Sequence, residues 1–288
     1  MASEPRRRPP QRRPPPRRRR RRRGGSDLVP RLLAAAPAIA FAVFITAEGG
    51  IVFAAGLFVV GALSLAELYR LTARVRPVAL AGYMALLGLL LAAHYGDQFQ
   101  MMLVLVASVP LTFLLTLMRP DRENAFWGMA ATLLGIVWIG LALSHAVLLR
   151  QLDHGGALVV DVLIGTFVGD TCAYFGGRAW GQRPLAPRIS PNKTVEGLII
   201  GIVGGTLAFW GFEVAYQQFM RGSNALVIGF AVAIAAPLGD LFESLIKRDL
   251  NVKDTGRVFG AHGGALDRLD GVMFTIVAGY YIWISLVH

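Results

Sequence analysis

Long apolar stretches separated by short polar connections dominate the pattern of this chain. A transmembrane helix needs about 20 predominantly apolar residues, and each stretch comes close to that length or exceeds it. The pattern therefore predicts an all-α polytopic membrane protein with about nine transmembrane helices and no network of strands. The predicted spans lie near residues 30–47, 49–67, 78–95, 98–118, 126–148, 157–177, 195–217, 225–246 and 269–287.

Lysine and arginine are distributed unevenly over the connections between these spans. Short loops rich in these residues stay in the cytosol during membrane insertion. The connections after the second, fourth, sixth and eighth spans hold most of them, whereas the opposite connections hold only Arg150 and Arg221. This asymmetry predicts a multi-pass protein with a cytosolic N-terminus, and the compact single chain suggests a bacterial plasma membrane. The basic residues of the even connections are Arg70, Arg74, Arg76, Arg119, Arg122, Arg178, Arg183, Arg188, Lys193, Lys247, Arg248, Lys253, Arg257 and Arg268.

The composition supports a membrane protein and assigns the net charge to one segment. Hydrophobic residues make up 55% of the chain and charged residues 16%, a balance unusual for a water-soluble domain. The net charge of +11 comes from residues 1–26, which contain twelve Arg and a single acidic residue, Glu4. An Arg- and Pro-rich segment cannot bury enough apolar surface to fold. Residues 1–27 are thus predicted to be a disordered cytosolic tail that seeks anionic lipids.

A nucleic-acid-binding arm is the alternative interpretation of this basic tail. Proteins that read nucleic acid usually add aromatic side chains or a folded reading module to the basic patch. Neither accompanies the tail in this sequence. We therefore expect membrane lipids, and no nucleic acid, as its partners.

Carboxylates inside the apolar spans are concentrated in the second half of the chain. A carboxylate at mid-bilayer costs about 2.5–3.5 kcal/mol on insertion scales, so it is expected to face a wet cavity, a cation or a basic partner. This concentration divides the chain beyond the tail into an anchoring half, residues 28–150, and a catalytic half, residues 151–288. The carboxylates concerned are Asp161, Asp170, Glu213, Asp240 and Glu243.

The span at 225–246 has a polar face near its end. Asp240, Ser244 and Lys247 follow one another at i, i+4 and i+7, which places them on one side of a helix. Pro237 removes a backbone hydrogen bond just before them and favours a kink there. Two interpretations remain open: a functional carboxylate, or a helix-end carboxylate that Lys247 satisfies.

The connection at 247–268 has the composition of a phosphate and metal site. Glycines let backbone amides approach phosphate oxygens, and basic side chains supply charge. Asp267 and Asp270 stand at i and i+3 at the start of the last span, where both can offer oxygen ligands to Mg²⁺. A solvated charged loop is the alternative. The polar residues and glycines concerned include Arg248, Lys253, Asp254, His262, Gly263, Gly264 and Arg268.

Residues 244–270 carry a resemblance to a known family. The run resembles the signature of the phosphatidate cytidylyltransferases, also called CDP-diacylglycerol synthases, without a gap. One departure is Ala265, where that family usually has a larger apolar residue. The matching elements are Ser244-x-Ile246-Lys247-Arg248, Lys253-Asp254-x-Gly256, Phe259-Gly260-x-His262-Gly263-Gly264 and Asp267-Arg268-Leu269-Asp270.

A second, weaker part of the resemblance lies upstream. Asn192 stands where the family commonly has a basic residue. Together the two parts cover roughly the last 120 residues, and the first half matches only in its hydrophobic character. The upstream elements are Asp170, Ala173-Tyr174, Gly177-Arg178 and Ser190-Pro191-Asn192-Lys193-Thr194-x-Glu196-Gly197.

The resemblance implies the reaction of CTP with phosphatidate to give CDP-diacylglycerol and diphosphate, dependent on Mg²⁺. In our hypothesis Asp240 and Asp267 bind the metal, with Asp270 also in the metal site. A cavity between the spans at 157–177, 225–246 and 269–287 admits both substrates. The residues assigned to catalysis are Asp240, Ser244, Lys247, Arg248 and Asp267. Those assigned to substrate binding are Asp170, Lys193, Lys253, Asp254, His262, Gly263, Gly264 and Arg268.

Several of these assignments leave alternatives open. Lys193 either holds the phosphatidate headgroup or belongs to a simple helix cap with a snorkelling side chain. His262 is assigned to loop structure or phosphate contact, with a general base as the alternative. Asp170 and Tyr174, at i and i+4, either line a cavity or form a satisfied buried hydrogen bond.

Two other classes of protein compete with this activity. A transferase of the CDP-alcohol phosphatidyltransferase type would use Mg²⁺ and similar substrates, but its expected Asp-Gly to Gly to Asp run is not found. A polytopic transporter would also carry intramembrane carboxylates, but usually with internal repeats, and none is evident. A homodimer is compatible with the sequence and is left open.

Overall fold

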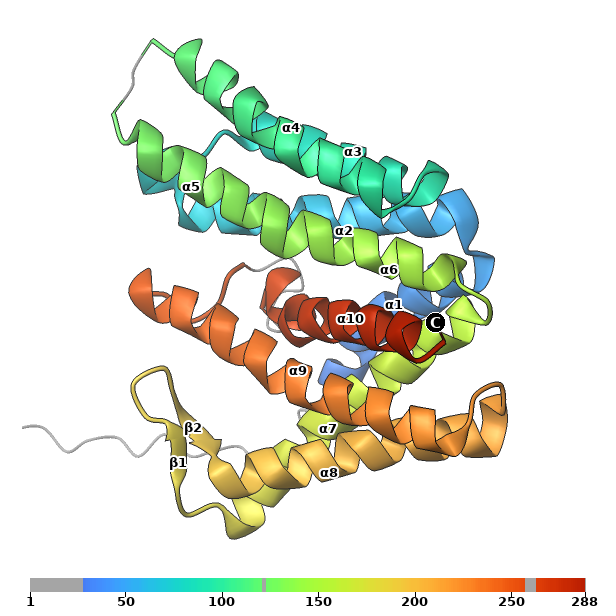
Figure 1. The fold of residues 1–288 in the computed structure, drawn as a ribbon. Coiled ribbons are helices and arrows are strands. Elements are labelled where there is room, and N and C mark those ends of the chain that lie inside the picture. The colour runs from blue at the N-terminus through green and yellow to red at the C-terminus, as the bar shows by residue number, and fades with distance from the viewer. Residues whose placement is uncertain (1–27, 121–122, 257–262, 288) are drawn as a thin grey trace, which may run out of the picture.

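The computed structural model describes residues 28–120, 123–256 and 263–287. The first part of the chain forms helices that run back and forth beside one another (Figure 1). They are α1 (Leu28–Glu48), α2 (Gly50–Leu71), the 3-10 turn η1 (Ala73–Val75), α3 (Ala79–Tyr95), α4 (Gln98–Leu117), and then α5 (Ala125–Gly135), the π-helical segment η2 (Ile136–Leu141) and α6 (Ala142–Gln151) in direct succession.

The second part of the chain places a small hairpin among longer helices. Its strands are antiparallel and pair Pro184 with Thr194 and Ala186 with Ser190. The hairpin connects α7 to α8 at one end of the bundle (Figure 1). The elements are α7 (Gly155–Trp180), β1 (Pro184–Ala186), β2 (Ser190–Thr194), α8 (Val195–Phe212) with its π-helical end η3 (Glu213–Gln217), α9 (Gly222–Asp249) and α10 (Leu266–Val287).

Helices lie at all of the predicted spans, and the all-α polytopic architecture is confirmed. Among the described residues, seven helical stretches are long and apolar enough to cross a membrane. Ala36–Glu48 and Ala79–Tyr95 are shorter apolar helices, so the predicted count of nine is approximate. The hairpin was not predicted, because three prolines between positions 184 and 191 hide any strand pattern.

Helices α7 and α8 approach each other closely through glycines. A Cβ placed on Gly205 would lie 2.8 Å from the backbone oxygen of Gly165, and one on Gly169 would lie 3.3 Å from that of Gly201. Small residues allow membrane helices to pack backbone against backbone. The two helices therefore form one tight wall beside α9.

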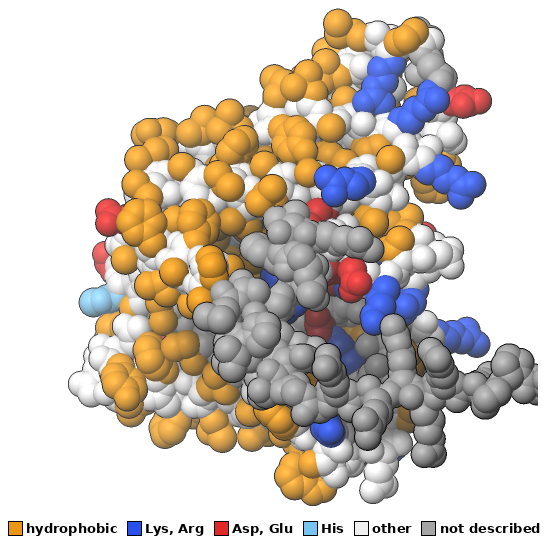
Figure 2. Space-filling view, turned by 180° about the vertical axis from the view of Figure 1, so that it is seen from behind, with side chains coloured by type: hydrophobic (Ala, Val, Ile, Leu, Met, Phe, Trp, Pro, Cys, Tyr) orange, Lys and Arg blue, Asp and Glu red, His pale blue; other side chains and the backbone are white. Residues whose placement is uncertain are grey.

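One end of the bundle carries most of the basic side chains. The α4–α5 connection, the hairpin and the C-terminal end of α9 lie at this end, on the left of Figure 1. On the face drawn in Figure 2, Lys and Arg side chains gather toward the corresponding edge, while apolar side chains cover much of the remaining coloured surface, with a few acidic side chains and a His among them. This separation suits a bilayer-spanning protein, and the assignment of the basic end to the cytosol remains a prediction.

Candidate active site

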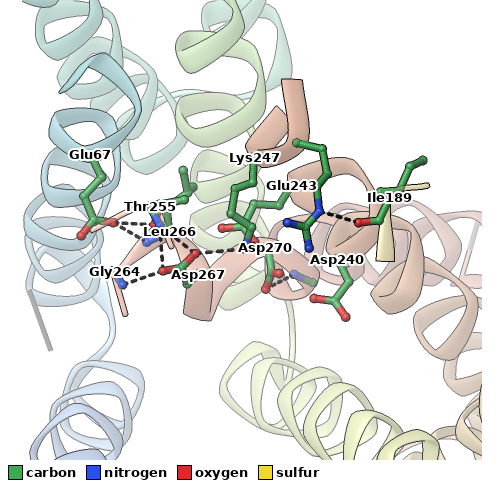
Figure 3. A network of polar contacts seen from close by, with 12 residues as sticks. Glu67, Ile189, Asp240, Glu243, Lys247, Thr255, Gly264, Leu266, Asp267 and Asp270 are labelled. Atoms are coloured by element: carbon green, nitrogen blue, oxygen red, sulfur yellow. Dashed lines mark hydrogen bonds and ion pairs between the residues drawn. The ribbon is translucent and has the colours of Figure 1, made fainter. Parts of the chain in front are cut away.

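Helices α9 and α10 meet at Gly239, and their contact brings two carboxylates together. A Cβ on Gly239 would overlap the backbone oxygen of Asp270, so glycine is needed for α10 to lie this close. Asp240 is the next residue on α9, and its side chain lies beside that of Asp270 (Figure 3). One carboxylate oxygen of Asp270 accepts a hydrogen bond from the backbone N–H of Gly271 at 2.9 Å. The two helices thus contribute a pair of acidic side chains.

Lys193 reaches this pair from the hairpin. Its ammonium group forms an ion pair with the Asp240 carboxylate. The two side chains are 27% and 35% exposed, so the pair borders open space. An anion in that space could therefore reach the Lys193 ammonium group directly.

The open space beside this pair is a cavity of about 430 Å³. Asp170 and Tyr174 line it, as do Lys193 and Asp240. Most of the remaining lining is apolar or glycine, from α7, α8, α9 and the hairpin. The cavity therefore combines a small charged region with an apolar wall.

The position of this cavity corrects one prediction. We expected the last span to form a wall, but α8 takes that place, and no described residue of α10 lines the cavity. The reason is that α10 packs on the Gly239 side of α9. Successive residues of a helix point about 100° apart, so Asp240 turns toward the cavity from the neighbouring face.

Lys247 lies behind this region and holds two further carboxylates. Its ammonium group pairs with Glu243, one turn earlier on α9, and with Asp267 of α10 at 3.1 Å. Glu243 is only 1% exposed. A buried carboxylate requires compensation, and Lys247 provides it here. The site residues assigned from the sequence did not include Glu243, although its i, i+4 spacing to Lys247 was a readable signal.

Asp267 closes the loop that connects α9 and α10. Its carboxylate accepts hydrogen bonds from the backbone N–H of Thr255 at 3.1 Å and from that of Gly264 at 2.7 Å. Gly263 precedes this contact with a φ of 88°, a left-handed conformation that favours glycine. Both oxygens of Asp267 therefore accept N–H groups of the protein, including the ammonium of Lys247.

Glu67 of α2 reaches the same loop from the first half of the chain. Its Oε2 accepts hydrogen bonds from the Thr255 hydroxyl at 3.3 Å and from the backbone N–H of Leu266 at 2.9 Å (Figure 3). The residue is 0% exposed. It was not among the residues assigned to the site. A carboxylate inside an apolar span was the available signal, and it was overlooked because the first half was taken as an anchor.

The other assigned residues surround this core. The Arg248 side chain donates to the backbone oxygen of Ile189 at 2.9 Å and ties α9 to the hairpin. Ser244 is half-buried on α9, whereas Lys253, Asp254 and Arg268 are exposed on the loop and at the start of α10. His262 lies outside the described residues. The roles assigned to all of these side chains stay predictions.

The chain is similar to known proteins along most of its length. A sequence model of the cytidylyltransferase family matches residues 29–286. A phosphatidate cytidylyltransferase of Bacillus subtilis (strain 168) is 30% identical over 264 residues, which are 89% of this chain and 97% of that protein. The similarity therefore includes both the first half and the site.

Two further relatives match over shorter segments. A phosphatidate cytidylyltransferase of Mycobacterium leprae (strain TN) is 37% identical over 164 residues, 56% of this chain and 51% of that protein. One of Helicobacter pylori (strain ATCC 700392 / 26695) is 39% identical over 124 residues, 42% of this chain and 45% of that protein. The matched segments span about half the length of these two relatives.

Proposed function

The chain belongs to the cytidylyltransferase family, and from this membership we propose that it is a phosphatidate cytidylyltransferase. It transfers the cytidylyl group of CTP to phosphatidate, forming CDP-diacylglycerol and releasing diphosphate. The observation that carries the proposal is the cavity of about 430 Å³ between membrane-spanning helices, with Lys193 and Asp240 in an otherwise mainly apolar wall. Such a wall suits a lipid with a phosphate headgroup.

The reaction exchanges one phosphoric anhydride bond for another. A phosphate oxygen of phosphatidate forms a bond to the α-phosphorus of CTP. The bond from that phosphorus to the oxygen bridging the β-phosphorus breaks, and its electron pair leaves with diphosphate. Because the lipid phosphate is already anionic near neutral pH, no protein base has to remove a proton. The protein must supply positioning and compensation of negative charge.

Lys193 is our choice for the phosphatidate headgroup. It stands at the cavity wall, and its ion pair with Asp240 is partly exposed. An incoming phosphate offers more negative charge than one carboxylate and more acceptor oxygens. Lys193 then turns from Asp240 to the headgroup, which frees the Asp240 carboxylate.

For the phosphates of CTP, we choose Lys247. It is held by Glu243 and Asp267 at the start of the catalytic loop, and Arg248 follows it on α9. We assign these two cations, together with Lys253 and Arg268, to the phosphates of the nucleotide and the diphosphate product. Their positive charge stabilises the negative charge that develops on the leaving group.

We propose Mg²⁺ as the cofactor, held by Asp240 and Asp270. Among the described side chains, no group of three or more His, Cys, Asp or Glu is placed to hold a metal ion. Two adjacent carboxylates nevertheless suit Mg²⁺, which is commonly bound by one or two carboxylates together with substrate phosphates and water. When bound, the ion would neutralise phosphate charge and polarise the α-phosphate.

Asp267 is a more demanding candidate for the metal. Its oxygens accept hydrogen bonds from Thr255, Gly264 and Lys247. It can join Asp240 and Asp270 only if Lys247 leaves it. The predicted transfer of Lys247 to a nucleotide phosphate would produce that change.

The activity is tested with CTP labelled at the α-phosphate and the purified protein in vesicles that contain phosphatidate. We expect label in a lipid product, dependent on both phosphatidate and Mg²⁺. No labelled lipid would overturn the proposal. Release of labelled CMP from CDP-lipid on addition of an alcohol would instead support the phosphatidyltransferase type, and accumulation of label inside vesicles without a covalent product would support a transporter.

We further propose that the N-terminus of the chain is cytosolic, and that the basic end of the bundle with the active site also faces the cytosol. The support is the concentration of Lys and Arg on that end (Figure 2) and the cytosolic location of CTP. The orientation is tested by labelling Arg188→Cys, in a chain whose native Cys172 is replaced by Ser, in spheroplasts before and after permeabilisation. Labelling that needs no permeabilisation would reject it.

A further inference from the structure

We propose that Glu67 of α2 is a positioning residue for cytidylyl transfer, which fixes the α9–α10 loop and through it Asp267. The proposal rests on the function given above and extends it to the first half of the chain. Among the described residues, Glu67 does not line the cavity and forms no hydrogen bond with Asp240 or Asp270. Its effect on the reaction must therefore pass through the loop.

Glu67 caps a helix to which it does not belong. Leu266 is the first residue of α10, and the N–H groups at a helix start have no partner within the helix. Glu67 Oε2 accepts the Leu266 N–H at 2.9 Å. A negative charge at this position is also favourable because the N-terminus of a helix is its positive end. The carboxylate thus sets where α10 begins.

The backbone at two glycines of the loop lies directly against the same carboxylate. A Cβ on Gly256 or on Gly264 would overlap the Glu67 carboxylate group. The sequence pattern suggested that these glycines let the backbone approach phosphates. The structure gives them a second purpose, which is to let the loop close over a side chain of α2.

Two residues beside Glu67 are the ones that bind Asp267. Thr255 donates its hydroxyl to Glu67 and its backbone N–H to Asp267. Gly264 packs against Glu67 and donates its N–H to Asp267 at 2.7 Å. Loss of Glu67 would release both donors together. Asp267 in turn holds Lys247, so the displacement reaches the residue assigned to the nucleotide phosphates.

The two oxygens of Glu67 are not equivalent, and this provides a conservative variant. Oε2 accepts both hydrogen bonds, whereas buried Oε1 has no hydrogen-bond partner among the described residues. Glu67→Gln can keep its carbonyl oxygen at the Oε2 position and put its NH₂ group where no hydrogen bond is lost. Glu67→Ala removes the acceptor altogether.

Glu213 is a matched control for loss of a buried carboxylate. It is also 0% exposed and accepts backbone N–H groups, from Phe219 and Met220. It lies in η3, far along the chain from the loop and its contacts. Glu213→Gln therefore measures the general effect of neutralising a buried acid in this protein.

The experiment compares the wild type with Glu67→Ala, Glu67→Gln and Glu213→Gln in vesicles, for kcat and for KM of both substrates. A displacement of about 1 Å at a reacting group can cost about 10²-fold in rate. We expect kcat of Glu67→Ala to fall by about that factor, with each KM changed by less than about threefold. The kcat of Glu67→Gln should be at least about tenfold higher than that of Glu67→Ala, and the kcat of Glu213→Gln should stay within about threefold of the wild type.

Hydrogen–deuterium exchange supplies a readout that does not depend on activity. Exchange at residues 250–256 and 263–270 should quicken in Glu67→Ala and stay unchanged in Glu213→Gln. The proposal is overturned if Glu67→Ala keeps the wild-type kcat or the wild-type exchange, or if Glu213→Gln loses as much kcat as Glu67→Ala. If the wild type forms no CDP-lipid, the proposed function is wrong. Hydrogen–deuterium exchange of Glu67→Ala then still tests whether Glu67 orders the loop.

Discussion

Replacing Asp267 with Asn tests the proposed role of the α9–α10 loop directly. The carboxylate accepts the backbone N–H groups of Thr255 and Gly264 and the ammonium of Lys247. Asn keeps one oxygen and replaces the other with an NH₂ donor. If the oxygen stays toward Lys247, the NH₂ group meets the N–H of Gly264. If the side chain turns over, it meets the ammonium of Lys247.

The magnitude of this effect follows from the contacts that are lost. A hydrogen bond to a charged group is worth about 1.5–3 kcal/mol, and each 1.4 kcal/mol corresponds to about a factor of ten in rate. If a contact with the backbone of Thr255 or Gly264 is needed in full in the transition state, its loss predicts roughly a 10- to 150-fold decrease in kcat. The remaining contacts weaken as well, because the acceptor is no longer charged. We expect kcat to fall by at least about 10²-fold.

The assay measures transfer of label from CTP, labelled at the α-phosphate, into lipid, with the amount of protein in the vesicle membrane quantified. Asp249→Asn is a suitable control, because this carboxylate is exposed at the end of α9, close to the same loop. Thermal unfolding of each variant separates loss of fold from loss of rate. Turnover by Asp267→Asn within about threefold of the wild type would refute the assigned role, since even one lost contact should exceed that change.

Three further predictions concern the headgroup site, the helix contact and the tail. Lys193→Met should raise KM for phosphatidate in a vesicle assay by about tenfold, equivalent to about 1.4 kcal/mol. Arg188→Met, a change at an exposed residue of the same hairpin, should leave this KM unchanged. A KM of Lys193→Met equal to that of the wild type would remove Lys193 from headgroup binding. Gly239→Ala should lower the free energy of unfolding by about 1–3 kcal/mol through overpacking against α10. Gly211→Ala, whose Cβ would meet nothing within 4 Å, should leave the stability unchanged or raise it. Thermal unfolding in detergent measures both, and a Gly239→Ala protein as stable as the wild type would contradict the close contact. Deletion of residues 1–26 should reduce activity on anionic vesicles but not on neutral ones; the same response on both would reject the lipid-seeking role of the tail.

Local sequence patterns predicted the helices well because a membrane span is a local property. Twenty apolar residues in succession require a backbone that satisfies its own hydrogen bonds in lipid, and a helix does this. The hairpin between α7 and α8 depends instead on pairing between its strands, such as Pro184 with Thr194. The sequence there lacks the alternation of apolar and polar residues that would predict a strand. The order of the walls around the cavity likewise depends on which face of α9 receives α10. Gly239 decides this contact, but a lone glycine in an apolar span does not identify its partner.

The same distinction explains which site residues could be anticipated. Lys247 and Asp267 belong to one short run of sequence, so their proximity was predictable. Glu67 lies 188 positions before Thr255 and 199 before Leu266, and nothing local to residue 67 names these partners. The prediction that the second half holds the site rests on the concentration of intramembrane carboxylates there. The carboxylate at position 67 was visible in the sequence, but its contacts with Thr255 and Leu266 are known only from the folded chain.

The charges gathered in the site form a set that the substrates and cofactor can complete. Lys193 pairs with Asp240, Lys247 pairs with Glu243 and Asp267, and Asp270 lies beside Asp240. Asp170 and Arg178 line the same cavity, and a divalent ion bound among these carboxylates would offset part of their negative charge. An ion at Asp240 and Asp270 would also weaken the hold of Asp240 on Lys193, because two cations then compete for one carboxylate. Lys193 would then be available to the lipid phosphate when the metal is bound. Binding of Mg²⁺ and of phosphatidate should therefore favour each other, as reciprocal coupling between two sites requires.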